Sequence, residues 1–181
     1  MSKTLDQYNV VLAKCKDIFT RKTVDYGTAW RVMRVTSITD QIYIKAKRIK
    51  TLEETGESKV GEGIVPEYIA IINYCIMGLI QLEKGFADDA DLNPEEAESL
   101  YTKHFEFTRD LMLKKNHDYG EAWREMRTKS LTDMIMMKLL RVKQIEDNSG
   151  KTLVSEGIDA NYHDIINYAV FALIQMGEAD A

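Results

Sequence analysis

The chain has 181 residues, of which 45% are hydrophobic and 29% are charged, and its net charge at pH 7 is −5. This length makes one domain of ordinary size or two small ones, with enough apolar residues to bury a core. The acidic balance argues against a dedicated nucleic-acid surface, because such a surface carries a basic excess. Cys15 and Cys75 are too few for a disulfide framework, so we expect both in the core.

The N-terminus and the most apolar stretch both indicate a cytoplasmic protein without a membrane span. The first nine residues lack the apolar segment of a secretory signal. The most apolar run, residues 64–82, is interrupted by Pro66, Glu67, Asn73 and Gln81, which favours a buried helix over a membrane-spanning one.

The first third of the chain predicts two helices joined by a short turn. The sequence Thr-Leu-Asp-Gln from Thr4 fits a capping box, so we expect the first helix to begin there. Gly27 suits the left-handed conformation that ends a helix, and a short helical turn follows over residues 30–34. Ser37 has the residue type of an N-cap, which predicts a second long helix from there to about Glu54.

A polar loop over residues 55–63 precedes a third predicted helix. Pro66 marks its start, because proline is favoured in the first turn of a helix, and we expect it to run to Lys84. Residues 86–93 form an acidic linker. Asn93, followed by proline and two glutamates, then predicts the start of the next helix.

From that point the chain repeats itself. The phrase DYGTAWRVMR at residues 25–34 returns as DYGEAWREMR at residues 118–127. Slightly more than half of the aligned pairs are identical in each of two stretches: 22–54 with 115–147, and 62–82 with 156–176. The chain is therefore a tandem duplication, and a repeat has to be identified before a fold is assigned. We name residues 1–85 the first repeat and residues 94–181 the second repeat.

Each repeat is predicted to contain three long helices. The third helix of each is apolar around most of its circumference, and such a helix has to be covered on all sides. Three helices alone cannot do this. We therefore predict an all-α fold in which two three-helix units pack as one pseudo-twofold helical bundle, with the two third helices at its centre.

Several basic residues recur at equivalent positions, in pairs three residues apart on one helical face. These pairs are Arg31 and Arg34, Arg124 and Arg127, Lys45 and Arg48, and Lys138 and Arg141. One interpretation is phosphate binding, because guanidinium and ammonium groups bind phosphate oxygens. The alternative is a solvated face or an internal network of salt bridges.

The third helix of the second repeat carries acids that the first repeat lacks. Glu156, Asp159 and Asp164 together have the oxygen ligands that Mg²⁺ or Mn²⁺ prefers, and Glu156 and Asp164 are the candidate catalytic residues. The first repeat keeps Glu62 but has Val65 and Ala70 at the other two positions. A simpler interpretation makes Asp159 the N-cap of its helix.

Four further repeated polar residues belong to the candidate site. Asp25 and Asp118 begin the repeated phrase. Asn73 and Asn167 lie in apolar helices and need hydrogen-bond partners, which the backbone, each other or a ligand base would supply.

Taken together, these motifs resemble the nucleotide modification associated domain family, type one. The resemblance rests on Lys-x-x-Asp-Tyr-Gly-x-Ala-Trp-Arg, then Asp-x-x-x-x-Lys-x-x-Arg, then Glu-x-x-Asp-x-x-x-x-Asp-x-x-Asn-Tyr, and it covers nearly the whole chain as two copies. It implies an intracellular all-α protein of nucleotide or modified-base metabolism, but supplies no reaction.

A more distant likeness is to MazG-like nucleoside triphosphate pyrophosphohydrolases, which place carboxylates from neighbouring helices around Mg²⁺. Glu156 and Asp159 match one half of that pattern, whereas Lys138 and Arg141 stand where the other half has glutamates. This departure favours direct phosphate binding by cations.

Three hypotheses remain open at this stage. The first is a metal-dependent nucleotide hydrolase, with basic residues contributed across the pseudo-twofold axis or by another subunit of a homodimer. The second is a module that binds a nucleotide or another phosphorylated small molecule without catalysis. The third is a helical structural or protein-interaction subunit. Convergence of the basic and acidic positions on one cleft would favour the first two.

Overall fold

The structure is a computed structural model that describes residues 3–56 and 63–180. Within these residues every regular element is helical, which confirms the all-α class. The first repeat contains α1 (Lys3–Tyr26), the 3₁₀ turn η1 (Ala29–Val32), α2 (Val35–Thr55) and α3 (Val65–Lys84). The second repeat contains α4 (Pro94–Tyr119), the 3₁₀ turn η2 (Ala122–Glu125), α5 (Thr128–Asp147) and α6 (Ile158–Gln175).

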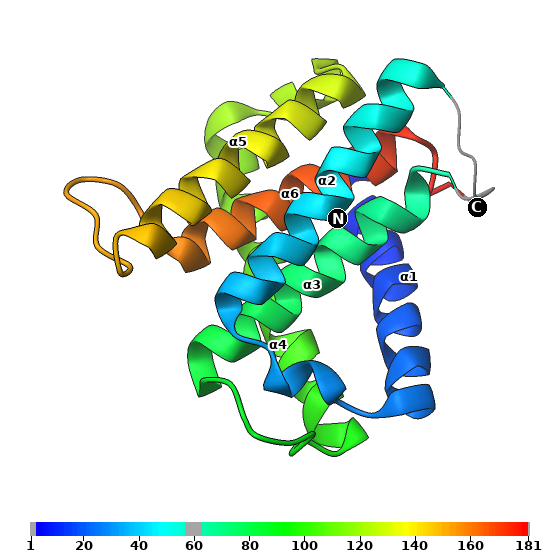
Figure 1. Cartoon of the computed structure of the whole chain (residues 1–181). Helices are drawn as coiled ribbons and strands as arrows, with labels where there is room; N and C mark the ends of the chain where they lie inside the picture. The colour runs from blue at the N-terminus through cyan, green and yellow to red at the C-terminus, as the bar shows by residue number, and fades with distance from the viewer. Residues whose placement is uncertain (1–2, 57–62, 181) are drawn as a thin grey trace.

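The six long helices form three layers, and each layer contains one helix from each repeat (Figure 1). The two third helices, α3 and α6, pack against each other at the centre. Helices α2 and α5 cover one side of this pair, and α1 and α4 cover the other. This arrangement confirms the predicted pseudo-twofold bundle with a shared core. Helix α3 is long and apolar enough to cross a membrane, but most of it is buried inside the bundle.

Helix ends follow the sequence where their caps are local. Gly27 has a φ of +66° at the exit of α1, and Asn93 and Glu96 form both halves of a capping box at the start of α4. Both cysteines are buried and free.

Two predicted N-caps are wrong. Helix α2 begins at Val35 after an extended Arg34, and Ser37 lies inside it because its N–H already bonds to the Arg34 carbonyl. Helix α6 is capped by Gly157, so Asp159 lies in its first turn. The first helix was predicted to begin at Thr4, but α1 already includes Lys3, so Thr4 lies inside it. Most of the predicted loop over residues 55–63, including Glu62, lies outside the described residues.

Reciprocal hydrogen bonds join the repeats across the core. The Tyr8 hydroxyl of α1 donates to the Asn167 side chain of α6 at 2.7 Å, and Tyr101 of α4 donates to Asn73 of α3 at the same distance. Each asparagine also donates to a main-chain carbonyl of the first helix in its own repeat. These partners satisfy the two buried amides that the sequence singled out.

A second reciprocal set lies between the central and outer layers. The Tyr162 hydroxyl lies 2.6 Å from the Thr39 hydroxyl of α2, and Tyr68 makes the same contact with Thr132 of α5. Each threonine also donates to a glutamate of the other repeat, Glu146 and Glu53 respectively.

Candidate functional site

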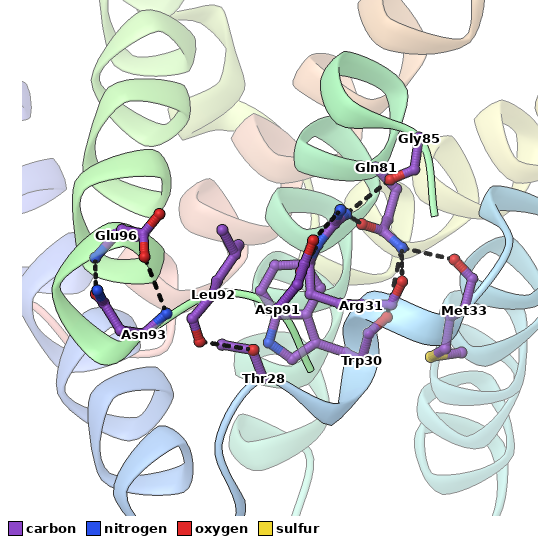
Figure 2. A network of polar contacts seen from close by, with 10 residues as sticks. All are labelled: Thr28, Trp30, Arg31, Met33, Gln81, Gly85, Asp91, Leu92, Asn93 and Glu96. Atoms are coloured by element: carbon purple, nitrogen blue, oxygen red, sulfur yellow. Dashed lines mark hydrogen bonds and ion pairs between the residues drawn. The ribbon is translucent and has the colours of Figure 1, made fainter. Parts of the chain in front are cut away.

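In the first repeat the turn η1 is held by a buried polar network around Arg31 (Figure 2). The Arg31 side chain is only 3% exposed; its Nε lies 2.8 Å from Asp91, and its Nη1 lies 2.8 Å from the Gly85 carbonyl and contacts Gln81. The hydrogen bond from Arg31 lowers the pKa of Asp91 below its usual range. Gln81 in turn donates to the main-chain carbonyls of Arg31 and Met33. The Arg31 guanidinium is therefore bound by groups of the protein itself.

In the second repeat Arg124 has the equivalent role. Its guanidinium lies over the Trp123 ring at 4.4 Å, donates to Glu121, and also donates to Thr4 and Gln7 at the start of α1. Each arginine thus bonds to the chain near the start of the first helix of the other repeat. Arg31 bonds to Asp91 just before α4, and Arg124 bonds to the first turns of α1.

Sequence reasoning missed the glutamines that support these turns. Gln175 donates to the Trp123 and Met126 carbonyls at 2.8 Å, as Gln81 does to the equivalent turn in the first repeat. The available signal was a glutamine kept at the same position of two apolar helices.

The other predicted site residues of the repeated phrase lie at the surface. Arg34, Arg127, Asp25 and Asp118 are all exposed. Arg34 lies 6.0 Å from the centre of the Phe86 ring, and Asp118 lies 3.2 Å from His117.

Basic residues of both α2 and α5 meet an acid of the adjacent third helix, but at different positions. In the first repeat Lys45 and Arg48 lie 3.5 and 2.5 Å from the carboxylate of Glu67. In the second repeat Lys138 lies 2.9 Å from Asp164, and Lys115 of α4 lies 2.6 Å from the same carboxylate. Because residue 70 aligns with residue 164, the acid lies one helical turn later in the second repeat.

The structure does not bring the three predicted metal ligands together. Asp164 is paired with two lysines, Asp159 lines a hollow that it shares with His163, and Glu156 lines a different groove. Within residues 3–56 and 63–180, no three His, Cys, Asp or Glu side chains are grouped so as to hold a metal ion.

An open groove of about 1080 Å³ runs between α5 and the segment before α6, and we name it the second-repeat groove. It brings together three of the predicted residues, namely Lys138, Arg141 and Glu156. Asn161, which aligns with Glu67, also lines it, so this groove lacks the acid that Arg48 meets in the first repeat.

A smaller cavity of about 280 Å³ lies between α1, η1 and α3, and we name it the first-repeat cavity. Four aromatic rings contribute to its wall: Phe19, Tyr26, Trp30 and Tyr74. Lys22, Ala70, Asn73 and Met77 also line it. The indole N–H of Trp30 is buried and has no hydrogen-bond partner among the described residues. Of this lining the sequence had singled out only Asn73 as a site residue.

The equivalent region of the second repeat carries different side chains, and two of them are larger. Phe171 stands where the first repeat has Met77, and its ring stacks on Trp123 at 4.2 Å with an interplanar angle of 4°. His163 and Asp164 replace Ile69 and Ala70. The two repeats therefore share a backbone arrangement, while the first keeps an open cavity beside its tryptophan.

Comparison with known proteins agrees with the duplication. The family described as nucleotide modification associated domain 1 matches residues 22–82 and again residues 115–176. No curated protein and no solved structure matches the chain. These comparisons bear on the first resemblance only, and the likeness to MazG-like enzymes stays a prediction. Because the two matches together cover about two thirds of its length, the chain belongs to the nucleotide modification associated domain 1 family, of which it contains two tandem copies.

Proposed function

We propose that this protein binds a nucleotide and that the base occupies the first-repeat cavity. The observation that carries this proposal is the ring of four aromatic side chains around a cavity of about 280 Å³. Aromatic side chains stack on nucleobases, with roughly 1–3 kcal/mol per base. The volume of about 280 Å³ lies just below the range of small-molecule pockets, roughly 300–1,000 Å³, and therefore suits one base better than a larger ligand.

The polar groups of the cavity are suited to reading the edge of a base. Both ends of the Asn73 amide are used, by the Cys15 carbonyl and the Tyr101 hydroxyl, so Asn73 shapes the wall. The Trp30 N–H, like that of Trp123 in the second repeat, is a buried donor without a partner among the described residues, and such a donor gains from a ligand acceptor. The Tyr26 phenol, whose pKa burial raises from 10, is neutral at pH 7 and can both donate a hydrogen bond to a ligand and accept one.

The test exchanges the residues by which the two repeats differ. Met77→Phe copies the second repeat and should fill the first-repeat cavity, weakening nucleotide binding at least tenfold in isothermal titration calorimetry. The matched control is Phe171→Met, which changes the same position of the other repeat and should leave the affinity of the first-repeat cavity unchanged. Failure of every common nucleoside and nucleotide to bind the wild-type chain, or equal affinities for wild type and Met77→Phe, would overturn the proposal.

Phosphate-ester hydrolysis in the second-repeat groove is a second candidate, favoured by the meeting of Lys138, Arg141 and Glu156 there. The two cations would bind phosphate oxygens, and the Glu156 carboxylate would accept a proton from the attacking water. The carboxylates form no metal site by themselves. Phosphate release from a nucleotide panel, with and without Mg²⁺ or Mn²⁺, tests this: Glu156→Gln should abolish turnover. Asp159→Asn should not, since Asp159 lines another hollow.

A further inference from the structure

The second repeat shows how two lysines of this fold hold an anion. Lys115 of α4 and Lys138 of α5 approach the two oxygens of the Asp164 carboxylate at 2.6 and 2.9 Å. The side chains of Asp164 and Lys138 are each 12% exposed, whereas that of Lys115 is 52% exposed, so the carboxylate and one of its lysines lie largely inside the protein. The anion is held from two different helices, and Phe171, two turns further along α6, stacks on Trp123.

The first repeat has the same two lysines without that carboxylate. Lys22 and Lys45 align with Lys115 and Lys138, and Ala70 aligns with Asp164. Lys22 and Ala70 both line the first-repeat cavity, and Lys22 forms no ion pair within the described residues. Lys45 lies 3.5 Å from Glu67, whose other oxygen is 2.5 Å from Arg48. Glu67 thus keeps a cationic partner when Lys45 turns to another anion.

We propose that Lys22 and Lys45 form a phosphate subsite at the mouth of the first-repeat cavity, in which a ligand phosphate replaces the Asp164 carboxylate. This inference rests on the proposed function and names its ligand class, a nucleoside monophosphate. Phosphate and carboxylate oxygens accept the same charge-assisted hydrogen bonds from lysine. A single phosphate satisfies the subsite, because the chain's own substitute in the second repeat is a single carboxylate.

Two independent substitutions in α6 agree with this assignment. Asp164 occupies the position of the phosphate, and Phe171, seven residues later, occupies the position of the base against the tryptophan. The second repeat therefore holds both parts of the ligand in the form of its own side chains. The first repeat has Ala70 and Met77 at these positions and leaves both places open.

The experiment compares nucleosides with their monophosphates on the full chain. Calorimetric titrations would use adenosine, guanosine, cytidine and thymidine, their 5′-monophosphates, and inorganic phosphate. At least one monophosphate should bind tenfold or more tightly than its nucleoside, the scale of one charge-assisted hydrogen bond. Lys22→Gln and Ala70→Asp should each remove that difference while the nucleoside affinity stays the same. Lys47→Gln, an exposed lysine of α2, is the control and should preserve it.

Each outcome decides between the two proposals. Equal affinity for a nucleoside and its monophosphate overturns the subsite and leaves base binding intact. Inorganic phosphate that binds as tightly as the nucleotide, and is lost in Lys22→Gln, supports the subsite but overturns base binding. Ala70→Asp should fold, because the second repeat carries aspartate beside the same lysines. If Ala70→Asp misfolds, Lys22→Gln, a change at an exposed residue, still tests the subsite. An unchanged difference in affinity between nucleoside and monophosphate in Lys22→Gln contradicts the subsite.

Discussion

His163 is a histidine in a core position that the first repeat fills with Ile69. Its Nδ1 lies 2.7 Å from the Thr108 hydroxyl, and its ring centre lies 5.0 Å from that of Phe107. Burial lowers the pKa of His163 from 6.5 to about 4, so the folded protein resists protonation there. Between these two pH values the unfolded chain binds a proton that the folded chain does not. The contribution of neutral His163 to stability is therefore complete above about pH 6.5 and is lost as the pH falls towards 4.

We expect His163→Ile to flatten the acid limb of the stability profile. The free energy of unfolding of the wild type should fall, relative to the variant, by about 2–3 kcal/mol between pH 7 and pH 4.5. Urea denaturation at both pH values measures this difference. His117→Gln, at an exposed position, should follow the wild type. Parallel profiles for wild type and His163→Ile would contradict the prediction.

Asp164 is expected to stabilise the fold in the absence of any ligand. Burial lowers the pKa of Lys115, but the hydrogen bond that Lys115 donates to Asp164 and the negative charges of Asp164 and Glu156 together outweigh it, so the pKa is raised overall. Asp164→Ala would leave Lys138, which is only 12% exposed, without its anion. The free energy of unfolding at pH 7 should fall by about 2–3 kcal/mol.

Two further variants separate burial from charge at this site. Lys115→Ala should cost at most about 1 kcal/mol, because half of that side chain is exposed. The double variant Asp164→Leu with Lys138→Met should recover much of the stability lost in Asp164→Ala. Thermal melts of the four proteins compare them, and equal losses for Asp164→Ala and Lys115→Ala would refute the role of burial.

Sequence analysis singled out polar residues that make important contacts, but it assigned some of them the wrong roles. Arg31 was placed among the phosphate ligands, yet its partner Asp91 lies in the linker, sixty residues away. Asp164 was placed among the metal ligands, yet it meets lysines from α4 and α5. These contacts join helices that are distant in the chain, and no local spacing rule predicts them. The duplication marked Arg31 because both repeats have an arginine at that position, and it marked Asp164 because the first repeat has Ala70 there instead.

At the scale of helices, the presence and approximate length of each long helix could be predicted from the spacing of apolar residues and from local caps. Gly27 and Asn93 are examples of such caps. The starts of α2 and α6 did not. Gln81 of α3 binds the carbonyls of the turn that precedes α2, so a neighbouring helix supports this junction and Ser37 is not needed as a cap. The cavity between α1 and α3 could not be predicted from the sequence either, since it depends on the side chain of Met77 being smaller than that of Phe171 at the equivalent position.

The close packing of α3 on α6 depends on Gly78. A Cβ at this position would lie 2.5 Å from the ring of Tyr162, whose hydroxyl contacts Thr39. Gly78→Ala should therefore displace that ring and lower the free energy of unfolding by about 1–3 kcal/mol, although alanine is the better helix former. Chemical denaturation gives the value. Ala172→Gly, the reverse exchange at the aligned position of α6, should cost only about 1 kcal/mol. Stabilisation by Gly78→Ala would show that the helices separate at no cost.

At the scale of the whole molecule, the two repeats depend on each other. The four tyrosines at the interface, Tyr8, Tyr68, Tyr101 and Tyr162, are fully buried, and each bonds to the other repeat. Residues 1–90 and 91–181 expressed separately should therefore aggregate or fold poorly, because each would expose one face of α3 or α6 together with unpaired hydroxyls. Size-exclusion chromatography and circular dichroism test this. Two stable, soluble monomers would disprove the shared core.

The covalent joining of the repeats has a consequence for stoichiometry. Two identical subunits in a symmetric dimer must carry the same residue at equivalent positions, so both would bind or neither would. A single chain is free of that constraint, and here Met77 and Ala70 are set against Phe171 and Asp164. Saturation should therefore require one ligand per chain, along a simple hyperbolic curve with a Hill coefficient of about 1, because Phe171 and Asp164 occupy the equivalent places of the second repeat.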